Sequence, residues 1–83
     1  MAKAAAIVLI QTEIGAETKV LDELTKLPEI KEAYVVYGTY DIVVKLESDA
    51  LEKIREIVTN KIRKLPDIRT TVTMIVVEER VKQ

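Results

Sequence analysis

A short motif occurs twice in this chain and divides it into two similar halves. Residues 26–31 read Lys-Leu-Pro-Glu-Ile-Lys, and residues 64–69 read Lys-Leu-Pro-Asp-Ile-Arg. Each copy follows a segment whose apolar residues recur with helical spacing, and each precedes a segment rich in the β-branched residues that favour strands. Proline ends a helix because it has no N–H to donate and its ring clashes with the preceding turn. The repeat therefore predicts the same strand–helix–turn–strand unit twice.

Apolar patterning predicts the secondary structure around this repeat. The expected elements are, in chain order, strand 4–11, helix 16–27, strand 30–37, strand 40–46, a second helix up to residue 65 and strand 69–77. Only Gly38-Thr39 separates the two middle strands, and so short a break predicts an antiparallel hairpin. Asp49 and Glu52 have the spacing of a capping box, which predicts that they open the second helix.

Two strand–helix–strand halves joined by a hairpin make the ferredoxin-like βαββαβ plan. We therefore expect an α+β fold with a four-stranded antiparallel sheet and both helices on one face. The right-handed crossover rule leaves few alternatives. A typical domain has about 100–150 residues, and this chain has 83. We expect residues 1–83 to form a single domain.

The second face of such a sheet poses a problem, because the strands are apolar on both sides. Residues 4–10 are continuously apolar, and residues 42–44 are also all apolar. Two helices can cover only one face, and a monomer rarely tolerates an exposed apolar patch larger than a few hundred Å². Burying that patch would contribute about 25 cal/mol per Å². We expect dimerisation through the sheet; the alternative is that loops or the C-terminal tail cover the face.

Composition excludes several classes of function. Thirteen basic and 14 acidic residues give a net charge of −1, which argues against direct DNA or RNA binding. The chain has no Cys and no His, so disulfides, the usual zinc ligand sets and Ser-His or Cys-His catalysis are excluded. We expect no enzyme activity, no metal and no cofactor. The helix charges, such as Lys53 and Arg63, are interpreted as a solvated face.

The same sequence also indicates where the protein resides. Its longest apolar run, residues 4–10, is far shorter than the ~20 residues needed to span a bilayer, and it lacks the features of a signal peptide. We therefore expect a cytoplasmic protein with no membrane partner. Abundant Glu and Lys with one Asn and two Gln suggest a thermophilic source.

The best local candidate for a binding site is the junction of the middle strands. Gly38 lets a ligand approach the main chain, exposed N–H groups in such a turn can bind a carboxylate, and Asp41 can accept from an ammonium group. Threonine hydroxyls at 70, 71 and 73 can donate and accept. Together these groups suit the zwitterionic head of a free amino acid. The alternative is structural, because Gly with a nearby Asp is first a turn signature in which Asp bonds backbone.

These segments resemble a known family. Residues 33–44, Ala-Tyr-Val-Val-Tyr-Gly-Thr-Tyr-Asp-Ile-Val-Val, resemble the effector-domain motif of the Lrp/AsnC family of feast/famine regulators. Residues 64–68, followed by Thr71-Val72-Thr73, resemble the closing signature of that domain. Family members carry an N-terminal helix-turn-helix domain, whereas only three residues precede the first strand here. The chain is therefore similar to a stand-alone effector-binding (RAM) domain without a helix-turn-helix domain.

The resemblance implies an assembly and a site. Such domains form dimers through their sheets, the dimers assemble into octamer or decamer rings, and amino-acid effectors bind in clefts between dimers. The effector-binding residues implied by position are Gly38, Thr39, Tyr40 and Asp41 in the Gly-x-x-Asp loop, with Thr71 and Thr73 facing the cleft from a neighbouring subunit. In this hypothesis Asp41 takes the α-ammonium group, the loop N–H groups take the α-carboxylate and the threonines assist. We expect Asp41→Ala to abolish effector binding and to leave the fold intact.

Three functions follow from these observations as alternatives. The first is a non-enzymatic amino-acid sensor related to transcription regulation, which could join full-length Lrp/AsnC regulators in mixed oligomers. The second is an ACT-like regulatory module, in which the loop at Gly15 and Ala16 would hold the ligand. The third is a small dimeric α+β-barrel enzyme, whose sites rely on His, Asn or Trp; this chain has only Asn60, on a helix flank.

Overall fold

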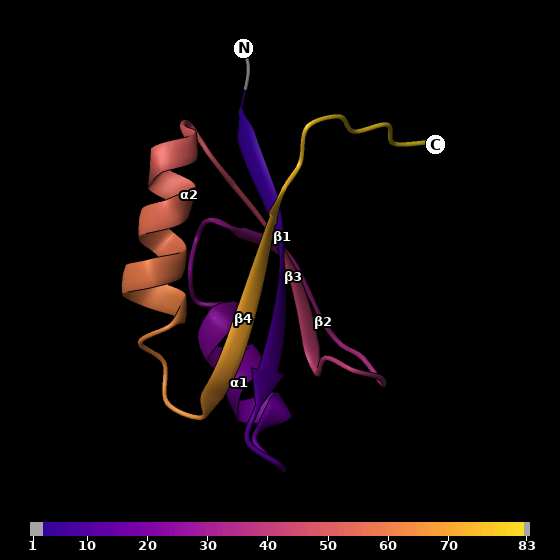
Figure 1. Cartoon of the computed structure of the whole chain (residues 1–83), viewed down its shortest axis with the longest axis vertical. Coiled ribbons are helices and arrows are strands. Elements are labelled where there is room, and N and C mark those ends of the chain that lie inside the picture. The colour runs from indigo at the N-terminus through magenta and orange to yellow at the C-terminus, as the bar shows by residue number, and fades with distance from the viewer. Residues whose placement is uncertain (1–2, 83) are drawn as a thin grey trace.

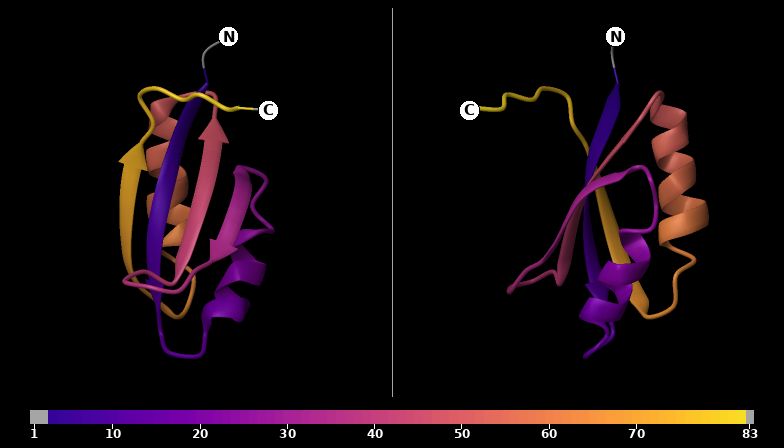
Figure 2. Two further views of the ribbon diagram at one scale, coloured as in Figure 1. Left: turned by 90° about the vertical axis from the view of Figure 1, so that its right-hand side faces the viewer. Right: turned by 180° about the vertical axis from the view of Figure 1, so that it is seen from behind.

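The computed structural model describes residues 3–82 and shows two layers, a four-stranded sheet and helices packed on one of its faces (Figures 1 and 2). The elements are, in order, β1 (Ala4–Thr12), α1 (Glu17–Leu24), β2 (Ile30–Val35), β3 (Ile42–Ser48), α2 (Leu51–Ile57), its π-helical continuation η1 (Val58–Ile62) and β4 (Ile68–Ile75). This order confirms the predicted ferredoxin-like βαββαβ fold.

The sheet has the strand order β2–β3–β1–β4, and all three pairings are antiparallel. The first and third strands therefore lie in the centre, while β2 and β4 form opposite edges (Figure 2, left). The loop that follows β2 does not stay at its own edge: it crosses β1, where the N–H of Asp41 donates to the carbonyl of Ile10, and its tip reaches toward β4 (Figure 2, left).

The core lies between the sheet and the helices, and strand alternation builds it. Its most buried side chains are Ala6, Val8, Ile10, Ile42, Val44 and Leu46 from the strands and Val20, Leu24, Ile54, Ile57, Val58 and Ile62 from the helices. The register places the buried residues of β1 directly beside those of β3, so one face of the central pair is fully covered. Burying one large aliphatic side chain contributes about 1.5–3 kcal/mol.

Both copies of the repeat make the same kind of turn between helix and strand. The N–H of Leu27 donates to the carbonyl of Leu24 at 3.0 Å, and the N–H of Leu65 donates to that of Ile62 at 3.1 Å. The first helix ends at Leu24 rather than at the predicted Leu27, because the chain tightens into turns before the proline is reached. In the second copy Asp67 adopts a φ of 71°, a left-handed conformation that Asp tolerates better than most residues.

The start of the second helix differs from the prediction. Ala50, not Asp49, occupies the N-cap position of α2, and no side chain there accepts a capping hydrogen bond. Asp49 lies one position too early to reach the helix N–H groups and instead faces Lys53, with Oδ2 and Nζ 3.6 Å apart. The predicted capping box is therefore wrong.

The sheet face opposite the helices is apolar, and in residues 3–82 no helix covers it (Figure 2, right). The register pairs Ile7 with Met74 and Leu9 with Val72 on this face, and Met74 and Val72 are 45% and 38% exposed. The C-terminal tail meets this face at Lys45, which forms an ion pair with Glu79, whereas Val77 of the tail is 96% exposed. The tail therefore leaves the apolar residues of β4 exposed, and the alternative in which it covers the face is wrong for the described chain. We call this surface the open face.

Candidate functional site

The loop that was predicted as the binding site is the hairpin tip between β2 and β3. The N–H of Val36 donates to the carbonyl of Asp41 at 2.9 Å and closes the tip. The tip projects beyond the sheet on the side of the open face (Figure 2, right). Gly38 and Thr39 are exposed, whereas Tyr40 is half-buried. No atom lies within 4 Å of where a Cβ of Gly38 would be, so the main chain there is open to a ligand.

Asp41 is fixed to β1 by two hydrogen bonds, one from its main chain and one to its side chain. Its N–H donates to the carbonyl of Ile10 at 2.9 Å. Its Oδ2 accepts from the N–H of Thr12, also at 2.9 Å, and Thr12 is buried. The carboxylate therefore joins the hairpin to the end of β1, in line with the structural interpretation. Contrary to the sequence-based expectation, Asp41→Ala would disturb the fold, because it removes the partner of a buried N–H.

A second contact connects the hairpin with β4. Gln11 Nε2 donates to the carbonyl of Thr39 at 2.9 Å, and Gln11 Oε1 accepts from the hydroxyl of Thr70. The register places Gln11 opposite Thr70 on the open face. Thr70 therefore points away from Thr71 and Thr73, with which the sequence had grouped it.

Gly38 and Asp41 line a hollow of about 510 Å³ at the β2 edge of the sheet. Glu17 and Thr18 at the start of α1 form its other wall. Asp41 and Glu17 make this hollow suited to an ammonium group, because carboxylates accept charge-assisted hydrogen bonds.

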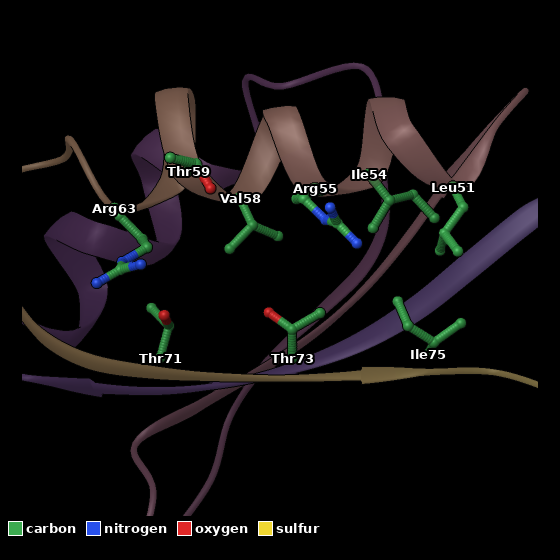
Figure 3. A pocket seen from close by; sticks show the side chains of 9 residues that line it. All are labelled: Leu51, Ile54, Arg55, Val58, Thr59, Arg63, Thr71, Thr73 and Ile75. Carbon is green, nitrogen blue, oxygen red and sulfur yellow. The ribbon is translucent and has the colours of Figure 1, made fainter.

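Thr71 and Thr73 line a different hollow, of about 350 Å³, at the β4 edge (Figure 3). The register pairs them with Ile10 and Val8, so both face the helix side of the sheet. The opposite wall is the second helix, and Arg55 of α2 and Arg63 just after η1 also line the cavity. We call this cavity the α2–β4 cleft.

Within one chain the predicted site residues thus fall into two groups that do not meet. The hairpin loop crosses β1 on the side of the open face, whereas Thr71 and Thr73 face the helix side, and the two hollows have no lining residue in common. Sequence reasoning missed the cleft arginines, because Arg63 was interpreted as part of a solvated face. Their helical spacing relative to the buried Ile54 and Ile62 could have placed them at the margin of the core.

The open face holds one charged contact among its apolar residues. Lys45 Nζ donates to the carboxylate of Glu79 and lies 3.7 Å from Glu47 Oε2. The hydrogen bond to Glu79 raises the pKa of Lys45 above 10.5, partial burial opposes this effect, and the charges of Glu79 and Glu47 add to it. The lysine is thereby kept charged beside Ile7, its partner in the register of β1 and β3.

Among residues 3–82 there is no group of three or more acidic side chains that could hold a metal ion. None of the helices in that range is long and apolar enough to cross a membrane.

The fold is that of one class of regulatory domain. The family model of the Lrp/AsnC ligand binding domain matches residues 5–83, and the chain therefore belongs to this family. Its fold is that of the family's RAM domains.

Particular relatives support this assignment. The chain is 34% identical over 73 residues to the HTH-type transcriptional regulator FL11 of Pyrococcus horikoshii, covering 88% of this chain and 48% of that protein. The crystal structure of FFRP-DM1 has a TM-score of 0.86 and 47% identity, over 89% of this chain and 99% of that one. The transcriptional regulator NMB0573 of Neisseria meningitidis, solved as an L-Met complex, has the same fold at 12% identity and a TM-score of 0.85, over 95% of this chain and 53% of that one.

The curated relatives are transcriptional regulators rather than enzymes. The chain spans less than half of the length of those that it matches. A regulatory, effector-binding role is therefore supported at the level of the domain.

Proposed function

We propose that this protein is a non-enzymatic domain that binds an amino-acid effector and self-associates, and that it serves transcription regulation. One observation carries the proposal: the candidate residues of the hairpin loop and those of β4 line two separate hollows that have no lining residue in common. A site that uses both groups needs two copies of the chain. The L-Met complex of the Neisseria regulator is a precedent for an amino-acid ligand on this fold.

The roles of the residues follow from their chemistry. Free N–H groups around Gly38 receive the α-carboxylate, and the carboxylate of Asp41 receives the α-ammonium group through the oxygen that Thr12 does not use. Thr39 and Tyr40 shape the loop. Thr71 and Thr73 of a neighbouring copy contribute hydroxyls from the α2–β4 cleft.

The open face supplies the contact that makes the dimer. Ile7, Leu9, Val72 and Met74 form its apolar centre, and Tyr34, which is 52% exposed, extends it onto β2. Two such faces packed together would remove this surface from water at about 25 cal/mol per Å². Dimers then assemble into an octamer or decamer ring, or join full-length Lrp/AsnC regulators in mixed oligomers. Such mixed assembly would place the protein in the cytoplasm with the DNA-binding partner.

The first experiment is a guanidinium melt in the presence of each standard amino acid at about 10 mM. A ligand that binds only the folded assembly stabilises it by RT ln(1 + [L]/Kd), about 2.7 kcal/mol at a hundredfold excess over Kd. We expect a shift with one or a few amino acids, and we expect Asp41→Asn to remove it. Asp49→Asn, at an exposed aspartate outside both hollows, is the control. No shift with any amino acid would contradict the effector function.

A second experiment tests the open face. We expect Leu9→Glu to lower the molar mass measured by sedimentation, because a charge would be buried at the centre of the dimer contact. Ile14→Glu, at a residue that is 98% exposed in the β1–α1 loop, is the matched control. Equal mass for Leu9→Glu and the unmodified protein would exclude this face as the interface.

The ACT-like alternative is less well supported. Neither Gly15 nor Ala16 lines the hollow at either edge of the sheet. Gly15 has a φ of 85°, which explains the glycine as a turn requirement. Replacing Gly15 and Gly38 separately distinguishes the two modes, because only the loop that holds the ligand should change its affinity.

A further inference from the structure

We infer that the α2–β4 cleft selects a small dicarboxylate, and that Arg55 and Arg63 are the residues that determine this specificity. The inference rests on the proposed effector function and names the chemical class of its ligand.

The first observation is the charge of the cleft. Its lining contains two guanidinium groups and three threonine hydroxyls, from Thr59, Thr71 and Thr73, and no carboxylate. Its remaining lining residues are apolar. The whole chain has a net charge of −1, so the cleft is a local concentration of positive charge on a protein that is otherwise balanced.

The second observation concerns ion pairs: among residues 3–82, neither of these two guanidinium groups forms one with a carboxylate. The chain has four arginines. Arg69 faces Glu13 at 3.9 Å and Arg80 faces Glu78 at 2.8 Å. Among residues 3–82, no carboxylate forms an ion pair with Arg55 or Arg63, although acidic side chains are abundant on the same helix. Both arginines that line the cleft therefore remain available to an external anion.

The third observation is how the groups are distributed (Figure 3). Val58 points into the cavity between the two arginines, with Arg63 toward the side of Thr71 and Arg55 toward the side of Thr73. The threonines are two residues apart on β4, so their Cα atoms are separated by about 7 Å. Two places along the cleft thus each offer a guanidinium group and a hydroxyl, and the apolar side chain of Val58 lies between them.

The π-helical turn contributes to this arrangement. The N–H of Arg63 donates to the carbonyl of Val58 at 2.9 Å. The acceptor is thus five residues before the donor, whereas in an α-helix it is four residues before it. Val58 remains buried in the core while Thr59 and Arg63 reach the cleft.

A short dicarboxylate matches this pattern, because its two acidic groups can each meet a guanidinium group while its methylene chain lies on Val58. Guanidinium groups form charge-assisted, bidentate hydrogen bonds with carboxylates. A cavity of about 350 Å³ is within the range of small-molecule sites. Acidic amino acids are the dicarboxylates that also carry an α-ammonium group for Asp41 of another copy, and the two oxygens of their α-carboxylate allow it to be shared between one guanidinium group and the loop N–H groups around Gly38 of that copy.

The apolar end of the cleft defines the competing ligand. Leu51, Ile54 and Ile75 lie beyond Arg55 (Figure 3), and they would accommodate the side chain of a neutral aliphatic amino acid. Such a ligand has one carboxylate, which would pair with one arginine and leave the other without an ion pair. The two ligand classes therefore differ in how many arginines affect binding.

The test is calorimetric titration of the whole protein with L-glutamate, L-aspartate, 2-oxoglutarate, L-glutamine and L-leucine. We expect glutamate or aspartate to bind, and we expect Arg55→Gln and Arg63→Gln each to weaken this binding about tenfold or more, as for the loss of a hydrogen bond to a charged group. Arg69→Gln, on β4 but outside the cleft, should leave the affinity unchanged. A denaturant melt without ligand checks that each variant is folded.

The outcomes separate this inference from the proposed function. Binding of glutamine or leucine as tightly as glutamate, or unchanged glutamate affinity in both cleft variants, would overturn the ligand class and leave the amino-acid effector in place. Binding of 2-oxoglutarate alone, lost in both variants, would support the dicarboxylate cleft and overturn the amino-acid effector. Absence of binding by all five ligands would overturn the dicarboxylate cleft, and the melt with every standard amino acid would then decide the effector function.

Discussion

Asp41 is a candidate ligand residue, and we predict that its side chain also stabilises the fold. Its Oδ2 lies 2.9 Å from the N–H of Thr12, and Thr12 is only 5% exposed. Replacing Asp41 with Ala leaves that buried N–H without a partner, which costs about 1–3 kcal/mol. Asp41→Asn retains an oxygen that can accept the bond but loses the charge, so we expect it to cost less than about 1 kcal/mol.

Urea unfolding without ligand and at one fixed protein concentration measures both costs, because self-association makes apparent stability depend on concentration. With a urea m-value of about 1–3 kcal/mol/M, the Ala variant should unfold at a midpoint lower by about 0.3–3 M. Asp49→Ala is the control; its exposed carboxylate lies 3.6 Å from Lys53, a pair expected to contribute about 0.3–0.5 kcal/mol. If Asp41→Ala were no more destabilising than Asp49→Ala, the bond to Thr12 would not stabilise the fold, and this reasoning would be refuted.

Three further predictions concern the framework of the site. Ile54→Ala should destabilise the fold by about 2–5 kcal/mol because its side chain is fully buried, whereas Leu51→Ala, at 46% exposure, should cost less than about 1 kcal/mol; urea melts compare the two. Gly15→Ala should cost about 1 kcal/mol or more by the same assay, since its φ is 85° and no neighbouring atom within 4 Å would add a clash. The contribution of the Lys45–Glu79 pair should be fully present below about pH 10 and be lost as the pH rises through the raised pKa of Lys45, because the folded state binds that proton more tightly. Melts across that range should show a decline that Glu79→Gln lacks.

The fold could be predicted from the sequence because local and global signals agree. The repeated Leu-Pro turn marks both helix–strand junctions, and the alternation of β1 and β3 matches the observed buried face. Element ends were less predictable. The helix before Pro28 ends at Leu24, because turn hydrogen bonds compete with helical ones well before the proline. The capping box at Asp49 was predicted wrongly for a related reason. A side chain can cap a helix only if the backbone places its residue at the N-cap, and here that residue is Ala50, one position later.

The candidate site was only partly predictable. The hairpin loop could be found because turn chemistry is local to Gly38 and Asp41. The α2–β4 cleft could not, since it depends on which face of β4 meets the helix and on a π-helical turn that places Arg63. Strand alternation alone would have separated Thr70 from Thr71, but only the register shows which of them faces the cleft.

The position of the two hollows has a consequence for how binding and assembly are linked. If one ligand contacts the loop at Gly38 in one copy and the threonine side of β4 in another, the separated copies each hold only half of its contacts. Ligand and assembly must then stabilise each other to the same extent. We expect the apparent affinity of any effector to fall when the protein is diluted below the concentration at which it assembles. Leu9→Glu should weaken binding in the same way, although Leu9 lines neither hollow. An affinity that is independent of protein concentration, and unchanged in a dissociated Leu9→Glu variant, would show that a single copy contains the complete site.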